Sequence, residues 1–342
     1  MVDRSHGSAP RHSSTLRAAM VITVVPASRR AGFIPRCAGL LFLLVAAPAR
    51  WTGASAASPV GIPPIDSHTS LLVVSPHPDD ESLCCAGVIR RVVAAGGRAS
   101  ILWLTSGDGS ELDMLFIERA LRVHPQKMRD LAVKRMSEAR AAAAVLGVPP
   151  RRQFFLGYPD GGLLTLVTDH FTTPYYSKFT GTASVPYPDT VAAGHPYTGE
   201  SLEQDFARVL DRIRPTLVLA PSPQDAHSDH RAAGVVTLQV LSRRHQLGAA
   251  RFWIVHGGRT WPRPRGLRMK LPLAEPPRGR GLELAAFALY PREEADKLEA
   301  LRQYRTQMSV MQSFLLSFVR TDELYSSLPV AAGGSTPARS RP

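Results

Sequence analysis

Residues 71–87, LLVVSPHPDDESLCCAG, constrain the fold of this chain more than any other stretch. Leu71 to Val74 is an apolar run with the length of a buried strand, and Pro76 and Pro78 end it. The ionisable side chains that follow are His77, Asp79, Asp80 and Glu81. A helix is predicted from about residue 82 to residue 95. Because ligands of open α/β sheets bind at the carboxyl ends of strands, this unit predicts a functional site directly after its strand.

A second cluster of imidazoles and carboxylates follows another strand-like run. Residues 216–220 are largely apolar, two prolines mark their exit, and the sequence then reads DAHSDH over residues 225–230. Zn²⁺ binds imidazole and carboxylate groups, and a catalytic zinc site needs three protein ligands and an open position for water. The first loop offers two ligands, so the second cluster is expected to supply the third. A solvated turn and surface helix residues are the alternatives for each motif alone.

Strands and helices alternate through the rest of the chain. Further strands are predicted at residues 100–104, 153–156, 216–220, 252–256 and 282–289. Further helices are predicted at residues 127–146, 201–214, 230–245 and 293–319. This alternation implies right-handed crossovers and a mostly parallel sheet. The expected fold class is therefore α/β, with a Rossmann-like sheet, helices on both faces and a single domain.

Two segments do not fit this alternation. Residues 163–200 are irregular, and the tyrosines in them either stack on a sugar ring or pack the loop down; they are Tyr175, Tyr176, Tyr187 and Tyr197. Residues 259–280 hold six Arg, one Lys and one Glu. This basic segment either lies near a membrane or an anionic glycolipid, or is a solvated loop.

The net charge of +13 does not indicate a nucleic-acid partner. Much of the excess lies in residues 259–280 and in residues 1–60, which hold seven Arg and one Asp. A nucleic-acid surface would instead be spread through the folded part and interleaved with aromatic residues. Cys84 and Cys85 are predicted to be small core residues, and no disulfide framework follows from them.

Residues 1–58 are predicted to be a leader rather than a domain. Arginines precede an apolar run at residues 38–47, and residues 54–56 fit an A-x-A cleavage pattern. We therefore expect export to the periplasm or the extracellular space. The alternative is an uncleaved membrane anchor, for which the apolar run is short. The tail at residues 330–342 is rich in Gly, Ser, Pro and Arg and is predicted to be disordered.

The two metal-type motifs together resemble those of the N-acetylglucosaminyl-phosphatidylinositol de-N-acetylase family, also called the PIG-L or LmbE-like family. These motifs are HPDDE at residues 77–81 and HSDH at residues 227–230, with supporting matches at residues 104–109 and 156–163. The likeness extends over residues 70–325, which we take as the deacetylase-like domain. It implies a Rossmann-like fold, one Zn²⁺ per chain, and hydrolytic removal of an acetyl group from an N-acetylated sugar conjugate. The implied partner is thus a small-molecule or glycan substrate.

The resemblance also implies roles for individual residues. The implied zinc ligands are His77, Asp80 and His230. Asp79 would be the general base, because a tight turn can aim it at a water molecule while the adjacent Asp80 binds the metal. His227 would be the electrophilic or general-acid histidine, since it lies three residues before His230 and shares its helical face. Ser228 departs from the family pattern, in which many members have Pro, and removes no catalytic group.

Other ionisable residues are weaker candidates. Glu81 and Asp229 either orient the ligand histidines or cap backbone N–H groups. Asp160 matches a substrate-side carboxylate of the family, and Asp108 either touches substrate or makes its turn. His256 ends a predicted strand and is a further candidate for the site. The alternative functions are a non-catalytic, metal-containing carbohydrate-binding protein and an amidase on a related glycoside. A dinucleotide-binding enzyme is excluded because no G-x-G-x-x-G follows the first strand.

Overall fold

The computed structural model describes residues 60–109 and 124–331 of the chain. At its centre is a five-stranded parallel sheet with the order β3-β2-β1-β4-β5. Its strands are β1 (Ser70–Ser75), β2 (Arg98–Thr105), β3 (Gln153–Tyr158), β4 (Leu217–Pro221) and β5 (Ala250–Trp253). Almost every residue of these strands is buried, as is usual for a parallel sheet that is covered on both faces. The predicted α/β class with a mostly parallel sheet is confirmed.

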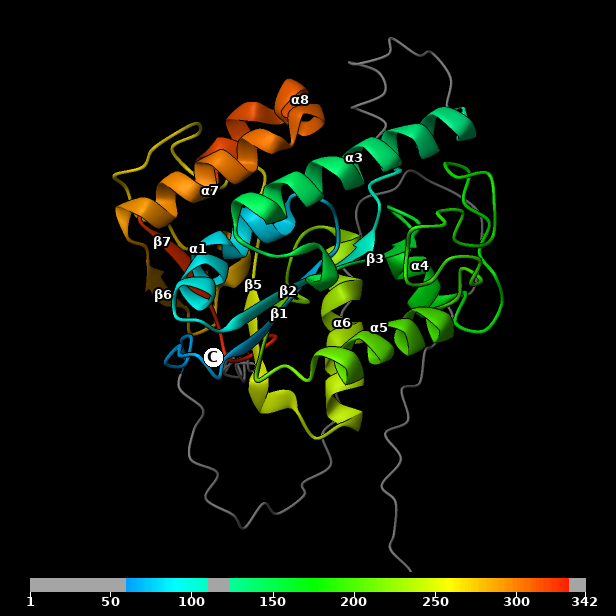
Figure 1. The fold of residues 1–342 in the computed structure, drawn as a ribbon, viewed down its shortest axis with the longest axis horizontal. Coiled ribbons are helices and arrows are strands. Elements are labelled where there is room, and N and C mark those ends of the chain that lie inside the picture. The colour runs from blue at the N-terminus through cyan, green and yellow to red at the C-terminus, as the bar shows by residue number, and fades with distance from the viewer. Residues whose placement is uncertain (1–59, 110–123, 332–342) are drawn as a thin grey trace, which may run out of the picture. The chain divides into compact units, whose positions relative to one another are not determined.

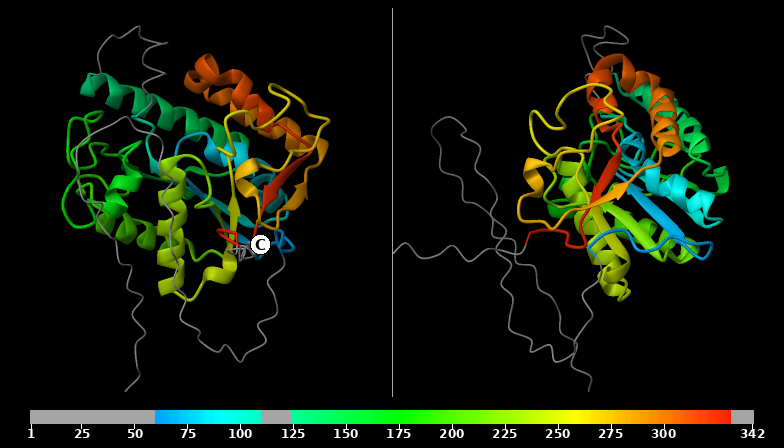
Figure 2. Two further views of the ribbon diagram at one scale, coloured as in Figure 1. Left: turned by 180° about the vertical axis from the view of Figure 1, so that it is seen from behind. Right: turned by 90° about the vertical axis from the view of Figure 1, so that its left-hand side faces the viewer.

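Helices cover both faces of the sheet. They are α1 (Asp80–Ala94), α3 (Pro125–Val145), α4 (Leu163–Thr168), α5 (Gly199–Ile213), α6 (Ser228–Arg243), α7 (Pro291–Gln303) and α8 (Arg305–Leu315). Short 3₁₀ helices lie at Pro150–Arg152, Leu247–Ala249, Pro277–Gly279 and Leu316–Phe318. Figures 1 and 2 show α1, α3 and α7 over one face and α5 and α6 over the other. Helix α4 falls in the segment that was expected to be irregular throughout.

The carboxy-terminal part differs from its prediction in two ways. The predicted strand at residues 282–289 is the shorter β6 (Ala285–Ala288), which pairs antiparallel with the unpredicted β7 (Asp322–Tyr325). The predicted helix at residues 293–319 is broken at Tyr304, whose ψ of 65° is not helical. The buried Tyr304 hydroxyl donates a hydrogen bond to Glu81, so a contact with a distant segment accompanies this break.

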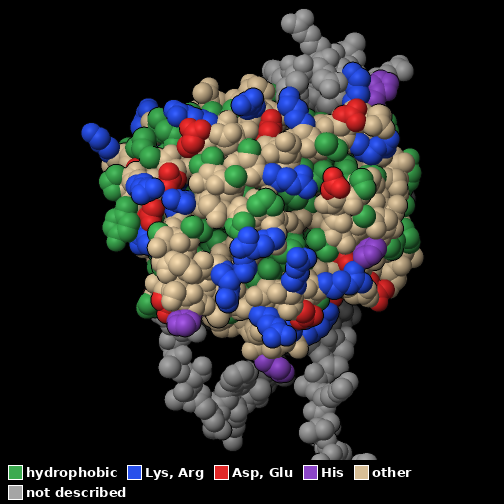
Figure 3. Space-filling model, in the orientation of Figure 1, with side chains coloured by type: hydrophobic (Ala, Val, Ile, Leu, Met, Phe, Trp, Pro, Cys, Tyr) green, Lys and Arg blue, Asp and Glu red, His purple; other side chains and the backbone are tan. Residues whose placement is uncertain are grey.

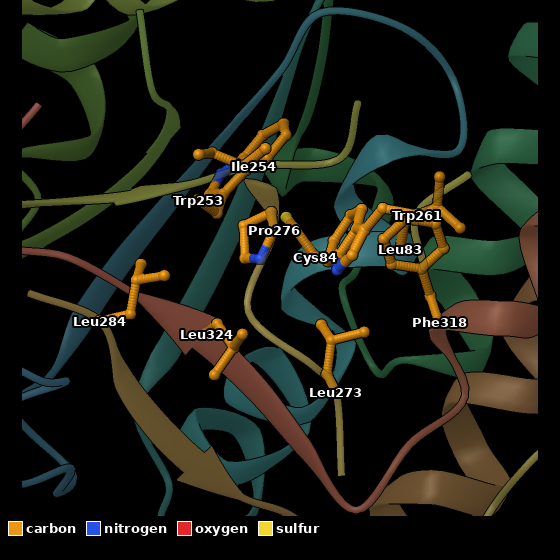
Figure 4. Close-up of a pocket in the computed structure, with 10 residues that line it drawn as sticks. All are labelled: Leu83, Cys84, Trp253, Ile254, Trp261, Leu273, Pro276, Leu284, Phe318 and Leu324. Atoms are coloured by element: carbon orange, nitrogen blue, oxygen red, sulfur yellow. The ribbon is translucent and has the colours of Figure 1, made fainter. Parts of the chain in front are cut away.

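Cys84 and Cys85 lie in the core as predicted, but the structure joins them to each other in a disulfide, which the sequence did not indicate. Cys84 also lines a small cavity of about 10 Å³ between α1 and the β6–β7 pair (Figure 4). The other lining side chains are aliphatic, aromatic or proline, and among them the indole N–H of Trp253 is buried without a hydrogen-bond partner. A buried water molecule usually needs two to four polar partners, so this single donor is a poor water site. We assign no function to this cavity.

The predicted leader at residues 1–58 lies outside the described residues, and so does residue 332 onward of the predicted tail. Within residues 60–109 and 124–331, no helix has both the length and the apolar character needed to cross a bilayer.

Candidate metal centre and active site

The candidate site lies where the strand order reverses, between β1 and β4. The loop after β1 carries the HPDDE motif, and the loop after β4 carries residues 225–230. The loops that follow β3 and β5 add Asp160 and His256 to the same edge of the sheet. Parallel strands that part at such a switch point leave a crevice outside their carboxyl ends. The topology therefore places the two predicted motifs side by side.

His77 is surrounded by carboxylates. Its Nδ1 lies 3.2 Å from Asp80 Oδ2, and its Nε2 lies 3.2 Å from Asp160 Oδ1 and 3.3 Å from Asp229 Oδ2. Burial opposes protonation of the ring, but Asp160, Asp229 and Asp80 outweigh it and raise the pKa of His77 well above its usual value. Three carboxylates around one imidazole leave an excess of negative charge that a bound cation would balance.

Asp80 lies between the two histidines that were predicted to share a metal with it. Its Oδ2 is 3.2 Å from His77 Nδ1 and 3.1 Å from His230 Nε2. Burial alone would raise the pKa of this carboxyl, yet His230 and His77 lower it well below its usual value. Asp80 is thus a carboxylate, and its oxygen meets one ring nitrogen of each predicted ligand histidine.

Asp225 fixes the orientation of His230, a role that was not predicted from the sequence. Asp225 Oδ2 accepts hydrogen bonds from the backbone N–H groups of Val255 (2.9 Å) and His256 (3.0 Å), and it lies 3.2 Å from His230 Nδ1. Burial opposes ionisation, but His230 in particular lowers the pKa of Asp225, so the carboxylate only accepts. His230 Nδ1 must therefore carry a hydrogen. The clue in the sequence was a carboxylate five residues before a candidate ligand, directly after a strand.

The Nε2 atom of His230 is free to bind a metal. It is buried and has no hydrogen-bond partner among the described residues, although it lies 3.1 Å from the Asp80 oxygen. Burial opposes protonation of the ring, but Asp80 and Asp225 raise the pKa of His230 to about 9, so without a metal the ring holds a second proton at Nε2. With hydrogen on Nδ1 alone, Nε2 presents a lone pair that faces another acceptor. Either a proton or a metal ion must therefore lie between His230 Nε2 and Asp80 Oδ2. The donor set of this chain therefore fits a metal ion such as Zn²⁺.

Several groups of side chains at this edge could hold an ion. Within each group, one ligand atom per residue lies within 4.8 Å of the others. The groups are His77 with His227 and His230, Asp80 with His230 and His256, and His77 with Asp160 and Asp229. None of these three groups holds all the predicted ligands: His77 and His230 share the first group, and Asp80 joins His230 in the second. The contacts of Asp80 Oδ2 with both histidines link the two groups.

Asp79 is held beside the ligand set in a strained conformation. Its φ of 126° is rare for a residue with a side chain and costs of order 1–3 kcal/mol. The preceding carbonyl, of Pro78, accepts hydrogen bonds from Gln307 (2.8 Å) and Arg135 (3.3 Å), which fix the peptide. Burial and then the neighbouring Asp80 carboxylate raise the pKa of Asp79 well above its usual value. A carboxyl with a raised pKa beside a metal site has the properties of a general base.

His227 is a neutral imidazole with a defined tautomer. Its Nδ1 accepts a hydrogen bond from the backbone N–H of Asp229 at 3.2 Å, so its hydrogen is on Nε2. Burial, and then His77 and His230, lower the pKa of His227 to about 3. The ring can therefore donate a hydrogen bond from Nε2 across the pH range of most enzymes.

His256 also belongs to the site, which the sequence indicated only weakly. Its ring centroid lies 4.7 Å from that of His230 and 5.0 Å from that of His227. Burial, and then His230, lower the pKa of His256 to about 4. The residue lies beyond the end of β5, which stops at Trp253 rather than at residue 256 as predicted.

Glu81 lies behind the loop instead of against the ligand histidines. Its Oε2 accepts hydrogen bonds from the indole N–H of Trp103 (2.8 Å) and from the backbone N–H of Asp79 (3.3 Å). Its Oε1 accepts from Ser82 and Tyr304. The geometry therefore favours the backbone-capping alternative for Glu81, because its oxygens tie the strained loop to β2 and the α7–α8 break.

Asp229 both contacts a predicted ligand histidine and caps backbone N–H groups, which were the two alternatives predicted for it. Its Oδ2 approaches His77 Nε2, and the same carboxylate accepts from the backbone N–H groups of Gly161 (2.7 Å) and Leu163 (3.1 Å). Leu163 is the first residue of α4, so Asp229 caps that helix rather than its own. Asp229 thereby joins the loop after β3 to the metal centre.

Asp160, which matches a substrate-side carboxylate, and Asp108, for which substrate contact was one of two alternatives, occupy different positions. Asp160 lies at the centre, against His77 and 3.7 Å from the Arg135 guanidinium. Asp108 is fully buried, and it accepts hydrogen bonds from the Asp160 backbone (2.8 Å) and the Tyr187 hydroxyl (2.8 Å). Burial, and then Asp160, raise the pKa of Asp108 to about 7. Its burial and its hydrogen bond from the Asp160 backbone favour the turn-making alternative for Asp108.

The tyrosines of residues 163–200 fall into two groups. Tyr187 and Tyr197 are buried, and Tyr187 is held by Asp108, so these two pack the loop down. Tyr176 is 64% exposed and remains available to a ligand.

Comparison with known proteins places these motifs in a family. The family model described as PIG-L, GlcNAc-PI de-N-acetylase, matches residues 72–241. A 1D-myo-inositol 2-acetamido-2-deoxy-alpha-D-glucopyranoside deacetylase of Actinosynnema mirum is 28% identical over 71% of this chain and 82% of its own length. A diacetylchitobiose deacetylase of Thermococcus kodakarensis is 24% identical over 52% of this chain and 51% of its own length.

Among solved structures, a deacetylase triple mutant involved in the teicoplanin biosynthetic pathway has a TM-score of 0.48 and 18% identity, over 75% of this chain and 97% of its own. The segment matched by the family model begins in β1 and ends in α6, and it contains both the HPDDE and the HSDH motifs. Residues 72–241 of this chain therefore form a PIG-L family segment.

Proposed function

We propose that this chain is a zinc-dependent de-N-acetylase that releases acetate from an N-acetylated sugar conjugate. The observation that carries the proposal is the convergence of His77, Asp80 and His230, with the unpartnered Nε2 of His230 facing the Asp80 carboxylate. Two relatives support the substrate class, because both are named as deacetylases and their named substrates are acetylated sugars.

In this proposal His77, Asp80 and His230 hold the metal. When bound, Zn²⁺ supplies Lewis acidity, which polarises a carbonyl group and lowers the pKa of water. Asp225 keeps His230 in the tautomer with hydrogen on Nδ1, so that Nε2 is the ligand atom. The surplus of carboxylates around His77 favours a divalent cation at this position.

Asp79 and His227 divide the proton transfers between them. Asp79 takes a proton from the attacking water, for which its raised pKa suits it. His227 offers its Nε2 hydrogen to the carbonyl oxygen, where negative charge develops as the amide is attacked. The amine that leaves needs a proton, which protonated Asp79 can return or His227 can donate.

Acetate release tests the proposal directly. The full chain, loaded with zinc, is incubated with a panel of N-acetylglucosamine conjugates, and acetate and bound zinc are measured before and after treatment with a chelator. We expect acetate release that the chelator abolishes and added zinc restores. Bound zinc together with glycan binding but no acetate from any conjugate would instead support a non-catalytic carbohydrate-binding protein.

Replacing Asp225 with Asn is expected to weaken zinc binding by about 10- to 100-fold, the usual effect of losing a carboxylate behind a ligand histidine. The amide can still accept from the backbone, but it no longer fixes the His230 tautomer by charge. Zinc affinity is measured by competition with a chromophoric chelator, and Asp130→Asn on the exposed face of α3 is the matched control. Unchanged affinity in the Asp225 variant would contradict the role given to this residue.

A further inference from the structure

A hollow of about 420 Å³ lies among arginine side chains that the active site does not use. Apart from Ile213, its lining residues are Arg98, Arg151, Arg152, Arg212 and Arg214. They come from three separate segments: the first residue of β2, the 3₁₀ helix before β3, and the carboxyl end of α5. The face drawn in Figure 3 carries neighbouring Lys and Arg side chains across its lower middle part.

The hollow and the candidate metal centre lie at opposite ends of the strands of the sheet. Arg98 begins β2, the 3₁₀ helix ends where β3 begins, and Arg214 precedes β4, so the arginines gather at the amino ends of strands. The metal centre lies at the carboxyl ends. The two ends of strand β2 lie roughly 23 Å apart, since seven steps of about 3.3 Å separate the first of its eight residues from the last. A ligand in the hollow would therefore not touch the metal ligands.

The arginines are not neutralised by the protein itself. Within residues 60–109 and 124–331, none of the five forms an ion pair with a carboxylate. Arg152 donates to Ser100 Oγ at 3.2 Å, and the Arg212 guanidinium lies 5.1 Å from the centre of the Phe154 ring. These two contacts orient the side chains and leave their charge uncompensated. The nearby Asp211 is paired with Arg244 on α6, at 3.1 Å.

The convergence of like charges is unfavourable without a counter-ion. Burial, and then repulsion from Arg98 and Arg151, lower the pKa of Arg152. A guanidinium group presents a planar fork of N–H donors that matches the oxygens of a phosphate group. The hollow also has the size of a small-molecule site, which is typically about 300–1,000 Å³. Five guanidinium groups around one hollow therefore suit a compact ligand with more than one negative charge.

We propose that this hollow is a second binding site, which takes a ligand bearing phosphate groups. Arginines from three chain segments would donate hydrogen bonds to the phosphate oxygens, and Ser100 and Phe154 hold Arg152 and Arg212 in place. A nucleic acid is a poorer match, because the hollow lacks exposed aromatic side chains between its cations on which bases could stack. The site is independent of acetate release, since no residue in it belongs to the metal centre.

The test uses the full chain and inorganic pyrophosphate as the probe. The test variant is Arg98→Gln/Arg151→Gln/Arg212→Gln, which removes three exposed charges from the hollow. The control variant is Arg263→Gln/Arg278→Gln/Arg280→Gln, which removes three exposed charges from residues 259–280. Both variants have the same net charge. Any pyrophosphate that binds at the metal centre or elsewhere does so equally in both.

Calorimetric titration at about 0.15 M salt, where distant charges are screened, separates the variants. We expect pyrophosphate affinity to fall at least about tenfold in the test variant, because charge-assisted hydrogen bonds are lost. The control should stay within about twofold of wild type, since none of its three arginines lines the hollow. Zinc content and acetate release should be unchanged in both, so a failure here is distinct from a failure of the deacetylase proposal.

Vesicles distinguish a free phosphate from a lipid headgroup. One outcome is that no pyrophosphate binds, while phosphatidylglycerol vesicles bind the wild type and the control but not the test variant. This outcome would assign the phosphate to a lipid headgroup. Pyrophosphate binding that only the test variant loses would assign it to a soluble ligand. Equal losses in the two variants, or a wild-type chain that binds neither probe, would overturn the proposal.

Discussion

Replacing Asp79 with Asn is expected to reduce kcat for acetate release by about 10²- to 10⁴-fold, the usual contribution of a positioned general base. Asn has the shape of Asp and tolerates positive φ better than most residues, so the strained loop should keep its conformation. The amide cannot take a proton from water. Zinc content should remain that of wild type, because the ligands proposed for the metal are His77, Asp80 and His230 and do not include Asp79.

The measurement pairs initial rates of acetate release with the zinc content of the same preparation. Asp130→Asn, an equal change on the exposed surface of α3, controls for the loss of one carboxylate. A variant that keeps its zinc but loses activity supports Asp79 as the base. Near wild-type rates with zinc bound would instead mean that another carboxylate, such as the central Asp160, accepts the proton.

The site could be predicted from the sequence because its signals are local. The residues that converge on the metal lie within a few positions of an apolar run that ends in prolines, once at β1 and once at β4. Consecutive parallel strands bring their carboxyl ends to one edge, so two such motifs meet whatever the details of packing. In the structure β4 lies directly beside β1, and this strand order brings the two motifs into contact.

The support of the site could not be predicted, because it comes from distant segments. Gln307 and Arg135 bind the carbonyl that precedes Asp79, and Tyr304 reaches Glu81 from the break between α7 and α8. A buried Arg in an Ala-rich helix and a Tyr within an apparently continuous helix carry no periodic or turn signal. Their partners become evident only when the chain is folded.

The arginine hollow was missed for a related reason. Along the sequence, the clearest concentrations of arginine lie in residues 1–60 and 259–280. The five arginines of the hollow are spread over residues 98–214 and are interspersed in the sequence with acidic residues that do not line the hollow. Their proximity depends on the crossovers that return β2, β3 and β4 to the same edge of the sheet.

Replacing His230 with Ala is expected to abolish zinc binding and acetate release together. The change removes the unpartnered Nε2 atom and leaves the Asp80 and Asp225 carboxylates without the imidazole between them. Zinc at about 1,000 times its dissociation constant stabilises a folded chain by about 4 kcal/mol, so wild type should unfold at a higher temperature with zinc than with chelator. The variant should show no such difference.

The test combines three measurements on each variant: its zinc content, its rate of acetate release, and the shift in its unfolding temperature when zinc is added. His68→Ala, which removes an exposed imidazole before β1, should retain all three and shows that the loss is specific to the site. Two further imidazoles, of His227 and His256, lie close enough to replace a lost ligand. If either did so, zinc and its stabilising effect would persist in the His230 variant. That outcome would contradict the ligand set proposed for His230 and would leave Asp225 without a metal-directed role.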